Sequence, residues 1–191
     1  MLTSTWCFLG NAKKHAKHSK TFSSCSASVE SGRNMDIVLD LQGFKDNSNR
    51  FIVKELAIAS TDGTFIQHWF VRSPFPLYNL DPAFKKQCIW NTRNHHGIEW
   101  SDGDITIQNL HRQLASILKN SVVYVKGQEK TRYVEEFFAP GLVIDLEYYP
   151  SLKDLRTSAV YCFFHKDSKL CCALNNVLKI VQYRNNSVSC Q

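Results

Sequence analysis

The stretch Asp36-Ile-Val-Leu-Asp-Leu41 decides how this chain folds, because it predicts a buried β-strand with a carboxylate, Asp40, inside it. Two further strand patterns follow, FIVKELAIAS at residues 51–60 and TFIQHWFVR at residues 64–72, and the turn signal Asp62-Gly63 separates them. Together the three patterns predict a meander that opens the folded domain.

Strand and helix patterns alternate after the meander. The expected elements are a short helix at 81–91 with Asp81 as N-cap and Pro82 at its first position, a helix through Ile107 to Leu118 with Asp102 and Asp104 as cap candidates, a strand at 122–126, a helix at 131–138, a strand at 142–146 and a closing helix at 170–183. Apart from the short helix, the order is β-β-β-α-β-α-β-α. This order predicts an α/β fold, a mixed sheet with helices packed on its faces.

The length and composition predict one domain with a core of ordinary size, from 191 residues of which 43% are hydrophobic. We place it at residues 35–186, followed by a short C-terminal tail, 187–191. Residues 1–34 are rich in Ser, Lys and His without apolar periodicity, which predicts a disordered tail. A mitochondrial transit peptide is less favoured, since the segment has one arginine and no amphipathic helix. The tail carries five Lys or Arg against one Glu, so the rest of the chain has a net charge of only +2.

The cysteine count is seven, an odd number with no obvious disulfide framework. The chain shows no secretory signal pattern and no run of the roughly 18–20 apolar residues that span a bilayer. We therefore expect a reducing compartment, cytoplasmic and/or nuclear, with no membrane partner and no small-molecule cofactor. In such a compartment, clustered Cys and His residues favour a metal site over disulfides.

One such cluster lies near the C-terminus, where Cys162-Phe-Phe-His165 precedes Cys171-Cys172. Two thiolates and an imidazole supply three ligands of a tetrahedral zinc site, and the fourth must come from a distant part of the chain. The alternatives are that the cysteines are buried core residues and that His165 is a surface residue. His95-His96 also suggests a metal or catalytic pair, but a solvated loop is the favoured interpretation. Four further cysteines have no partner pattern: Cys7, Cys25, Cys88 and Cys190.

The predicted order, with an acidic residue on the first strand, resembles the ribonuclease H-like fold of DEDD exonucleases. That resemblance implies an Asp-x-Glu motif on the first strand, an Asp at the helix after the fourth strand, and His-x-Ala-Leu-x-Asp on the last helix. This chain has Asp40-Leu-Gln42, then Lys130 or Thr131, then Cys171-Cys172-Ala-Leu-Asn-Asn176 at these places. One carboxylate cannot assemble a two-metal centre, so we expect the exonuclease chemistry to be absent and Asp40 to be a hydrogen-bonded structural remnant.

Three stretches carry a closer resemblance: Cys162-x-x-His165 followed by Cys172-Ala-Leu, Lys126-Gly-Gln-Glu-Lys-Thr-Arg132, and Lys54-Glu-Leu56. Over residues 36–184 the chain resembles the Maelstrom domain, an offshoot of the same fold that has lost the acidic site. The resemblance implies one structural zinc ion held by Glu55, Cys162, His165 and Cys172. Two alternatives stay open: Glu55 could pair with Lys54 or Arg72, and Cys171 competes with Cys172 as a ligand.

The same resemblance implies binding of single-stranded RNA in small-RNA (piRNA-type) silencing of transposons in the germline, with silencing-pathway proteins as partners. It also implies a weak RNA endonuclease activity, for which we name no catalytic residue. Lys126, Lys130, Arg132 and Arg72 are the candidate phosphate contacts, and Trp69, Trp90 and Trp100 offer faces for stacking bases, with core burial as the alternative. The small charge of the domain favours a second hypothesis, a protein-interaction or scaffold module with a structural zinc and no nucleic-acid activity.

Overall fold

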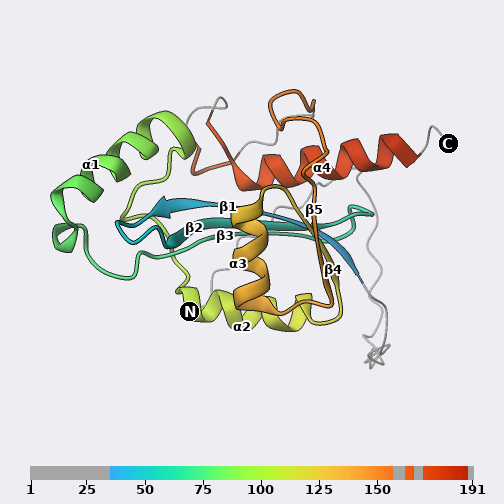
Figure 1. The fold of residues 1–191 in the computed structure, drawn as a ribbon, viewed down its shortest axis with the longest axis horizontal. Helices are drawn as coiled ribbons and strands as arrows, with labels where there is room; N and C mark the ends of the chain where they lie inside the picture. The colour runs from blue at the N-terminus through green and yellow to red at the C-terminus, as the bar shows by residue number, and fades with distance from the viewer. Residues whose placement is uncertain (1–34, 157–161, 166–169, 189–191) are drawn as a thin grey trace, which may run out of the picture. The chain divides into compact units, whose positions relative to one another are not determined.

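The central feature of the fold is a five-stranded mixed sheet in the order β3-β2-β1-β4-β5 (Figure 1). The computed structural model describes residues 35–156, 162–165 and 170–188, all within the compact unit Arg33–Gln191. The strands are β1 (Asp36–Lys45), β2 (Phe51–Ser60), β3 (Ile66–Phe70), β4 (Val122–Val125) and β5 (Leu142–Asp145). β1, β2 and β3 pair antiparallel, as the predicted meander requires, and β4 and β5 are parallel to β1 and to each other.

Four α-helices accompany the sheet within the described residues: α1 (Pro82–Asn91), α2 (Ile107–Leu118), α3 (Gln128–Phe138) and α4 (Ala173–Val188). Asp81 caps α1 as predicted, because its side chain accepts hydrogen bonds from the backbone of Ala83 and Phe84. The predicted caps of α2 are wrong. Thr106 caps that helix instead, with its hydroxyl accepting from the Asn109 backbone, since the chain turns into the helix only after Asp102 and Asp104.

The boundaries of the closing elements differ from their predictions by a few residues. α3 begins at Gln128 and α4 at Ala173, where residues 131 and 170 were predicted. α4 continues to Val188, beyond the predicted end of the domain at residue 186. A short 3-10 helix (Leu77–Asn79) and a π-helical turn (Thr92–His96) were not predicted. The predicted tail, 1–34, and residues 189–191 lie outside the described residues.

The two faces of the sheet bury different chemistry. On one face, β1 residues Ile37, Leu39 and Leu41 pack with the leucines of α2 and with α3 in an apolar core. On the other face, Val38 of β1 and Ala57 of β2 pack with Val177 of α4. Figure 1 shows α4 and α2 on opposite sides of the sheet. Because side chains alternate along a strand, Asp40, Gln42 and Glu55 all fall on the α4 face.

No helix in the described part of the chain has the length and the apolar character that crossing a membrane would require.

Candidate functional site

The candidate site begins at an irregularity between β1 and β2. Gln42 pairs with Glu55 and Asp40 pairs with Ala57, after which a bulge between Gln42 and Gly43 shifts the register. A Cβ atom at Gly43 would clash with the backbone of Ile52, so this close approach of two strands requires glycine. Two polar clusters lie beside this bulge on neighbouring strands, one around Asp40 of β1 and one around Glu55 of β2.

The Glu55 cluster brings together the four residues that were expected to bind zinc. The carboxylate of Glu55 is fully buried, and the Cys172 thiol lies 3.4 Å from its Oε1. His165 Nδ1 lies 3.1 Å from Cys162 Sγ, and His165 Nε2 lies 3.5 Å from Glu55 Oε2. Strand β2, the start of α4 and the loop before it therefore meet at one point. His165 is buried, which contradicts the alternative that it is a surface residue.

A fifth residue, His68 on β3, belongs to this cluster and was missed in the sequence. Its Nε2 lies 2.7 Å from Glu55 Oε1. One ligand atom from each of Glu55, His68, Cys162 and Cys172 falls within a set whose members all lie within 4.8 Å of one another, and the predicted ligand His165 is not in this set. The alternation of the third predicted strand carried the signal, since His68 shares a face with Phe70, the residue paired with Glu55.

Two buried atoms of the Glu55 cluster make no hydrogen bond within the described residues: Glu55 Oε2 and His165 Nε2, which face each other. Buried polar atoms are normally satisfied, so an unsatisfied carboxylate oxygen and imidazole nitrogen beside two thiols fit a metal ion. Carboxylate, thiolate and imidazole are all ligand types that zinc accepts. The chain thus contains a group able to hold a metal.

The electrostatics of the two thiols are asymmetric. The hydrogen bond from Cys172, with further help from His165, lowers the pKa of Cys162 to about 4, although burial acts against this. The same hydrogen bond, together with burial, raises the pKa of Cys172. The hydrogen bond to Cys162 and the charge of Glu55 raise the pKa of His165 against the effect of burial. These shifts favour the thiolate form of Cys162 and the thiol form of Cys172, and a cysteine must lose its proton to bind a metal ion.

The contacts bear on the alternatives left open for Glu55 and Cys171. Lys54 turns away from Glu55, and its ammonium donates to Ser73 Oγ and to the carbonyl oxygens of Trp100 and Asp102. Arg72 donates to the Asp104 carbonyl oxygen, so neither basic residue pairs with Glu55. Cys171, like His165, lies outside the group of candidate ligands, which contains Cys172.

Other residues singled out in the sequence have varied environments. His96 is fully buried and accepts a hydrogen bond from the Ile98 backbone, which contradicts a solvated loop at that position, whereas His95 is exposed. Burial lowers the pKa of His96 to about 4. Trp100 and Cys88 are buried together, whereas Trp90 is 62% exposed. Cys7, Cys25 and Cys190 lie outside the described residues.

The Asp40 cluster is closed, which here means that both carboxylate oxygens accept hydrogen bonds from side chains of the protein. Asp40 is buried, and its Oδ1 receives a short hydrogen bond from the Lys130 ammonium. Its Oδ2 receives hydrogen bonds from Asn176 Nδ2 at 2.8 Å and from Gln42 Nε2 at 3.1 Å. These are the positions at which the exonuclease motifs were compared with the sequence, and the fold brings all four together. Within the described residues Asp40 belongs to no group of three or more metal-ligating side chains.

The four predicted RNA contacts are not equivalent. The Lys126 ammonium donates to the carbonyl oxygens of Leu146 and Tyr149, at 3.0 and 2.7 Å, and the Lys130 ammonium is held by Asp40. Both lysines thus have internal structural contacts. Arg132 and Arg72 are exposed. Contact with RNA stays a prediction for all four residues.

Comparisons with known proteins bear on the fold. No protein-family model matches the chain, and no curated protein matches it. Two solved structures of the Mopeia virus exonuclease domain are similar to it, one partially complexed with manganese and one fully depleted of manganese. Each has a TM-score of 0.55 and 18% sequence identity, and the match covers 80% of this chain and 78% and 77% of the viral chains. The chain therefore has the predicted mixed α/β fold of the exonuclease, ribonuclease H-like type.

Proposed function

We propose that this chain is a single-stranded RNA-binding domain built on an exonuclease fold without two-metal hydrolysis. The observation that carries the proposal is the closed Asp40 cluster, in which Lys130, Gln42 and Asn176 occupy both carboxylate oxygens. Two-metal hydrolysis needs several carboxylates to hold its cations. A fold of the nuclease type that has only one is suited to holding nucleic acid without this cleavage.

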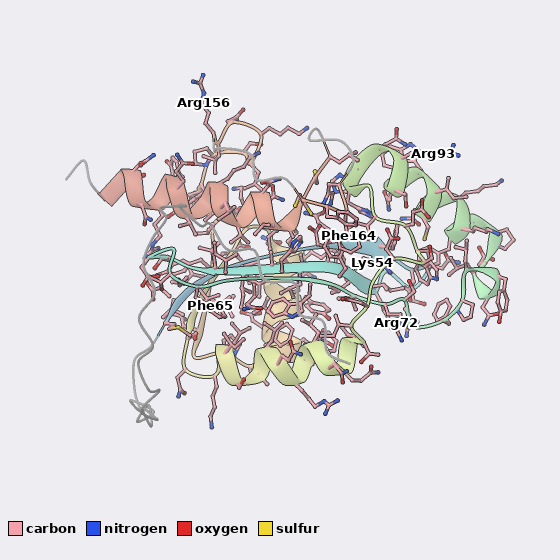
Figure 2. All side chains as sticks on the ribbon, turned by 180° about the vertical axis from the view of Figure 1, so that it is seen from behind. Lys54, Phe65, Arg72, Arg93, Arg156 and Phe164 are labelled. Carbon is pink, nitrogen blue, oxygen red and sulfur yellow. The ribbon has the colours of Figure 1, made fainter. Side chains whose placement is uncertain are left out.

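The surface near the Asp40 cluster supports an attraction for phosphate. Burial raises the pKa of the Cys171 thiol, while the positive charges of Lys130 and Lys153 act in the opposite direction. Lys153 is exposed, as is Arg156, which projects outward on the α4 side of the sheet (Figure 2). Arg72 lies toward the α2 side in the same view. Exposed basic side chains of this kind bind nucleic-acid backbones without sequence preference.

The direct test is a titration of single-stranded RNA at several salt concentrations. Lys153→Glu and Arg132→Glu should weaken binding and reduce its salt dependence, since each removes one phosphate contact. Lys119→Glu, an equal charge change at the end of α2, is the matched control and should leave binding unchanged. Absence of binding at low salt, or equal losses in all three variants, contradicts the proposal.

One structural zinc ion belongs to the same proposal. Glu55, Cys162, His165 and Cys172 would hold it, and their spread over β2, α4 and the loop before α4 would make the ion a tie between sheet and helix. Four protein ligands leave no open position for substrate, so the ion would stabilise the fold and supply no catalysis. His68, 2.7 Å from Glu55 Oε1, would fix the orientation of that carboxylate.

The finer roles implied by the Maelstrom resemblance are part of the proposal: small-RNA silencing of transposons, silencing-pathway partners and a weak RNA endonuclease activity. The nuclease type of the fold is the one observation that supports the endonuclease activity. Incubation of labelled RNA with purified protein tests it, and cleavage should persist in Asp40→Asn, since Asp40 is not available for metal chemistry. Loss of cleavage in that variant, with dependence on Mg²⁺ or Mn²⁺, indicates a two-metal nuclease instead.

A second candidate function is a protein-interaction module with a structural zinc and no nucleic-acid activity. The observation that favours it is a group of exposed apolar side chains at and before α1: Leu77, Tyr78, Ile89 and Trp90. Leu77 and Ile89 line a surface pocket together with Trp100 and Arg93. A domain that binds no RNA at low salt, yet keeps its zinc, would favour this second function.

A further inference from the structure

The contacts of Asp40 raise the question of what neutralises a buried carboxylate. Its side chain is 1% exposed, and an isolated charge at that depth is strongly unfavourable. Three donors reach it from three elements: Gln42 from β1 itself, Lys130 from the first turns of α3, and Asn176 from α4. Only Lys130 carries a charge, so the ammonium is the counter-ion of this centre.

We propose that Lys130 is a resident cation that takes the place of a divalent metal ion at Asp40, and that removal of its ammonium opens the centre to Mn²⁺. A cation approaching Asp40 now meets an ammonium at Oδ1 and two amide N–H groups at Oδ2. Like charges repel, and the single carboxylate is already neutralised. Without the ammonium, one carboxylate and two amide oxygens remain as ligands, because the amides of Gln42 and Asn176 can turn their oxygens inward.

Lys130 and Asp40 differ in exposure, so the proposal predicts different effects for the substitution of each. The Lys130 side chain is 20% exposed, whereas that of Asp40 is 1% exposed. In Asp40→Asn, Lys130 can turn toward water and keep its charge solvated. In Lys130→Ala, no other cationic side chain of the described residues contacts the carboxylate, which stays buried. The inference concerns this cluster alone and holds whether or not the domain binds RNA.

The experiment compares thermal unfolding of the wild type, Lys130→Ala and Asp40→Asn/Lys130→Ala, each with and without Mn²⁺. We expect Lys130→Ala to unfold at a lower temperature than the wild type, and Mn²⁺ to raise its midpoint. Mn²⁺ should leave the midpoints of the wild type and of the double variant unchanged. The double variant retains the Glu55 cluster, so it also controls for Mn²⁺ binding there.

Each alternative outcome decides the matter. If Lys130→Ala does not fold while the double variant does, the lysine is needed only because of the buried carboxylate, which supports the proposal. If neither folds, Lys130 has a role other than that of counter-ion and the proposal is wrong. It is also wrong if Lys130→Ala is as stable as the wild type. The proposal is also wrong if Mn²⁺ raises the unfolding midpoint of the wild type and Asp40→Asn removes this effect. It is wrong as well if Mn²⁺ changes the midpoints of Lys130→Ala and of the double variant equally.

Discussion

The Glu55 and Asp40 clusters lie on neighbouring strands, face the same helix and are both buried, yet their chemistry is opposite. In the Asp40 cluster every carboxylate oxygen has a donor from the protein. In the Glu55 cluster a carboxylate oxygen and an imidazole nitrogen face each other beside two thiols, and neither has a hydrogen-bond partner among the residues that the structure describes. A buried polar cluster whose atoms all have hydrogen-bond partners needs no ion. A cluster that has unpaired metal-ligating atoms is suited to binding a metal ion.

The largest expected effect comes from the unsatisfied cluster. Cys162→Ser should remove the bound zinc and destabilise the fold by several kcal/mol, since the apparent binding energy of structural zinc reaches about 10 kcal/mol or more. Metal analysis of the purified protein and denaturant unfolding measure both quantities. Cys88→Ser, at a buried cysteine outside the cluster, is the control and should keep its zinc. A folded, metal-free wild type would show that the cluster is not a zinc site.

The closed Asp40 cluster predicts the next largest effect, and substitutions of its two charged residues should differ in cost. Lys130→Met should cost about 3 kcal/mol, because it leaves an uncompensated buried carboxylate, whereas Asp40→Asn should cost only about 1 kcal/mol. Denaturant unfolding with and without a zinc chelator separates the clusters. Chelation should lower the stability of both variants by the same amount as that of the wild type. Equal costs for the two substitutions would contradict the role of Lys130 as counter-ion.

A third prediction concerns His68, which shares the Glu55 cluster with His165. His68→Ala should weaken zinc binding by about 10- to 100-fold, as loss of a residue that orients a ligand does, whereas His165→Ala should abolish it. Competition with a chromophoric chelator measures both affinities. His68→Gln keeps an N–H group able to reach Glu55 and should restore most of the affinity. If His68→Ala instead abolishes zinc binding and His165→Ala only weakens it, then His68 is the ligand and His165 orients another ligand.

The smallest expected effect is at the surface. Arg132→Glu and Lys153→Glu should each lower the affinity for single-stranded RNA several-fold and reduce the salt slope by about 1. A filter-binding or anisotropy titration with Lys119→Glu as control measures this. Neither variant should change the zinc content, because both residues are exposed and lie outside the metal group. A change in zinc content would mean that the substitution had disturbed the fold.

Much of the fold could be predicted because its signals are local. The alternation and apolar content of residues 36–41 and 51–60, and the spacing of Leu110, Leu114 and Leu118, report burial of one side of each element. The ends of α3 and α4 and the cap of α2 were harder to predict. They depend on where the backbone finds hydrogen-bond partners, and several nearby residues could serve equally well.

By itself the sequence determined the element order, the Cys and His candidates for a metal site and the absence of carboxylates at Gln42, Lys130 and Asn176, because these follow from residue type and short-range spacing. Only the tertiary structure decided that His68 joins Glu55, that His96 is buried, and that Lys126 and Lys130 have internal contacts. These contacts join residues from different elements, some more than a hundred positions apart, and depend on strand register and helix packing. The contacts confirm that Asp40 is hydrogen-bonded, and only the tertiary structure identified Lys130 as its cationic partner.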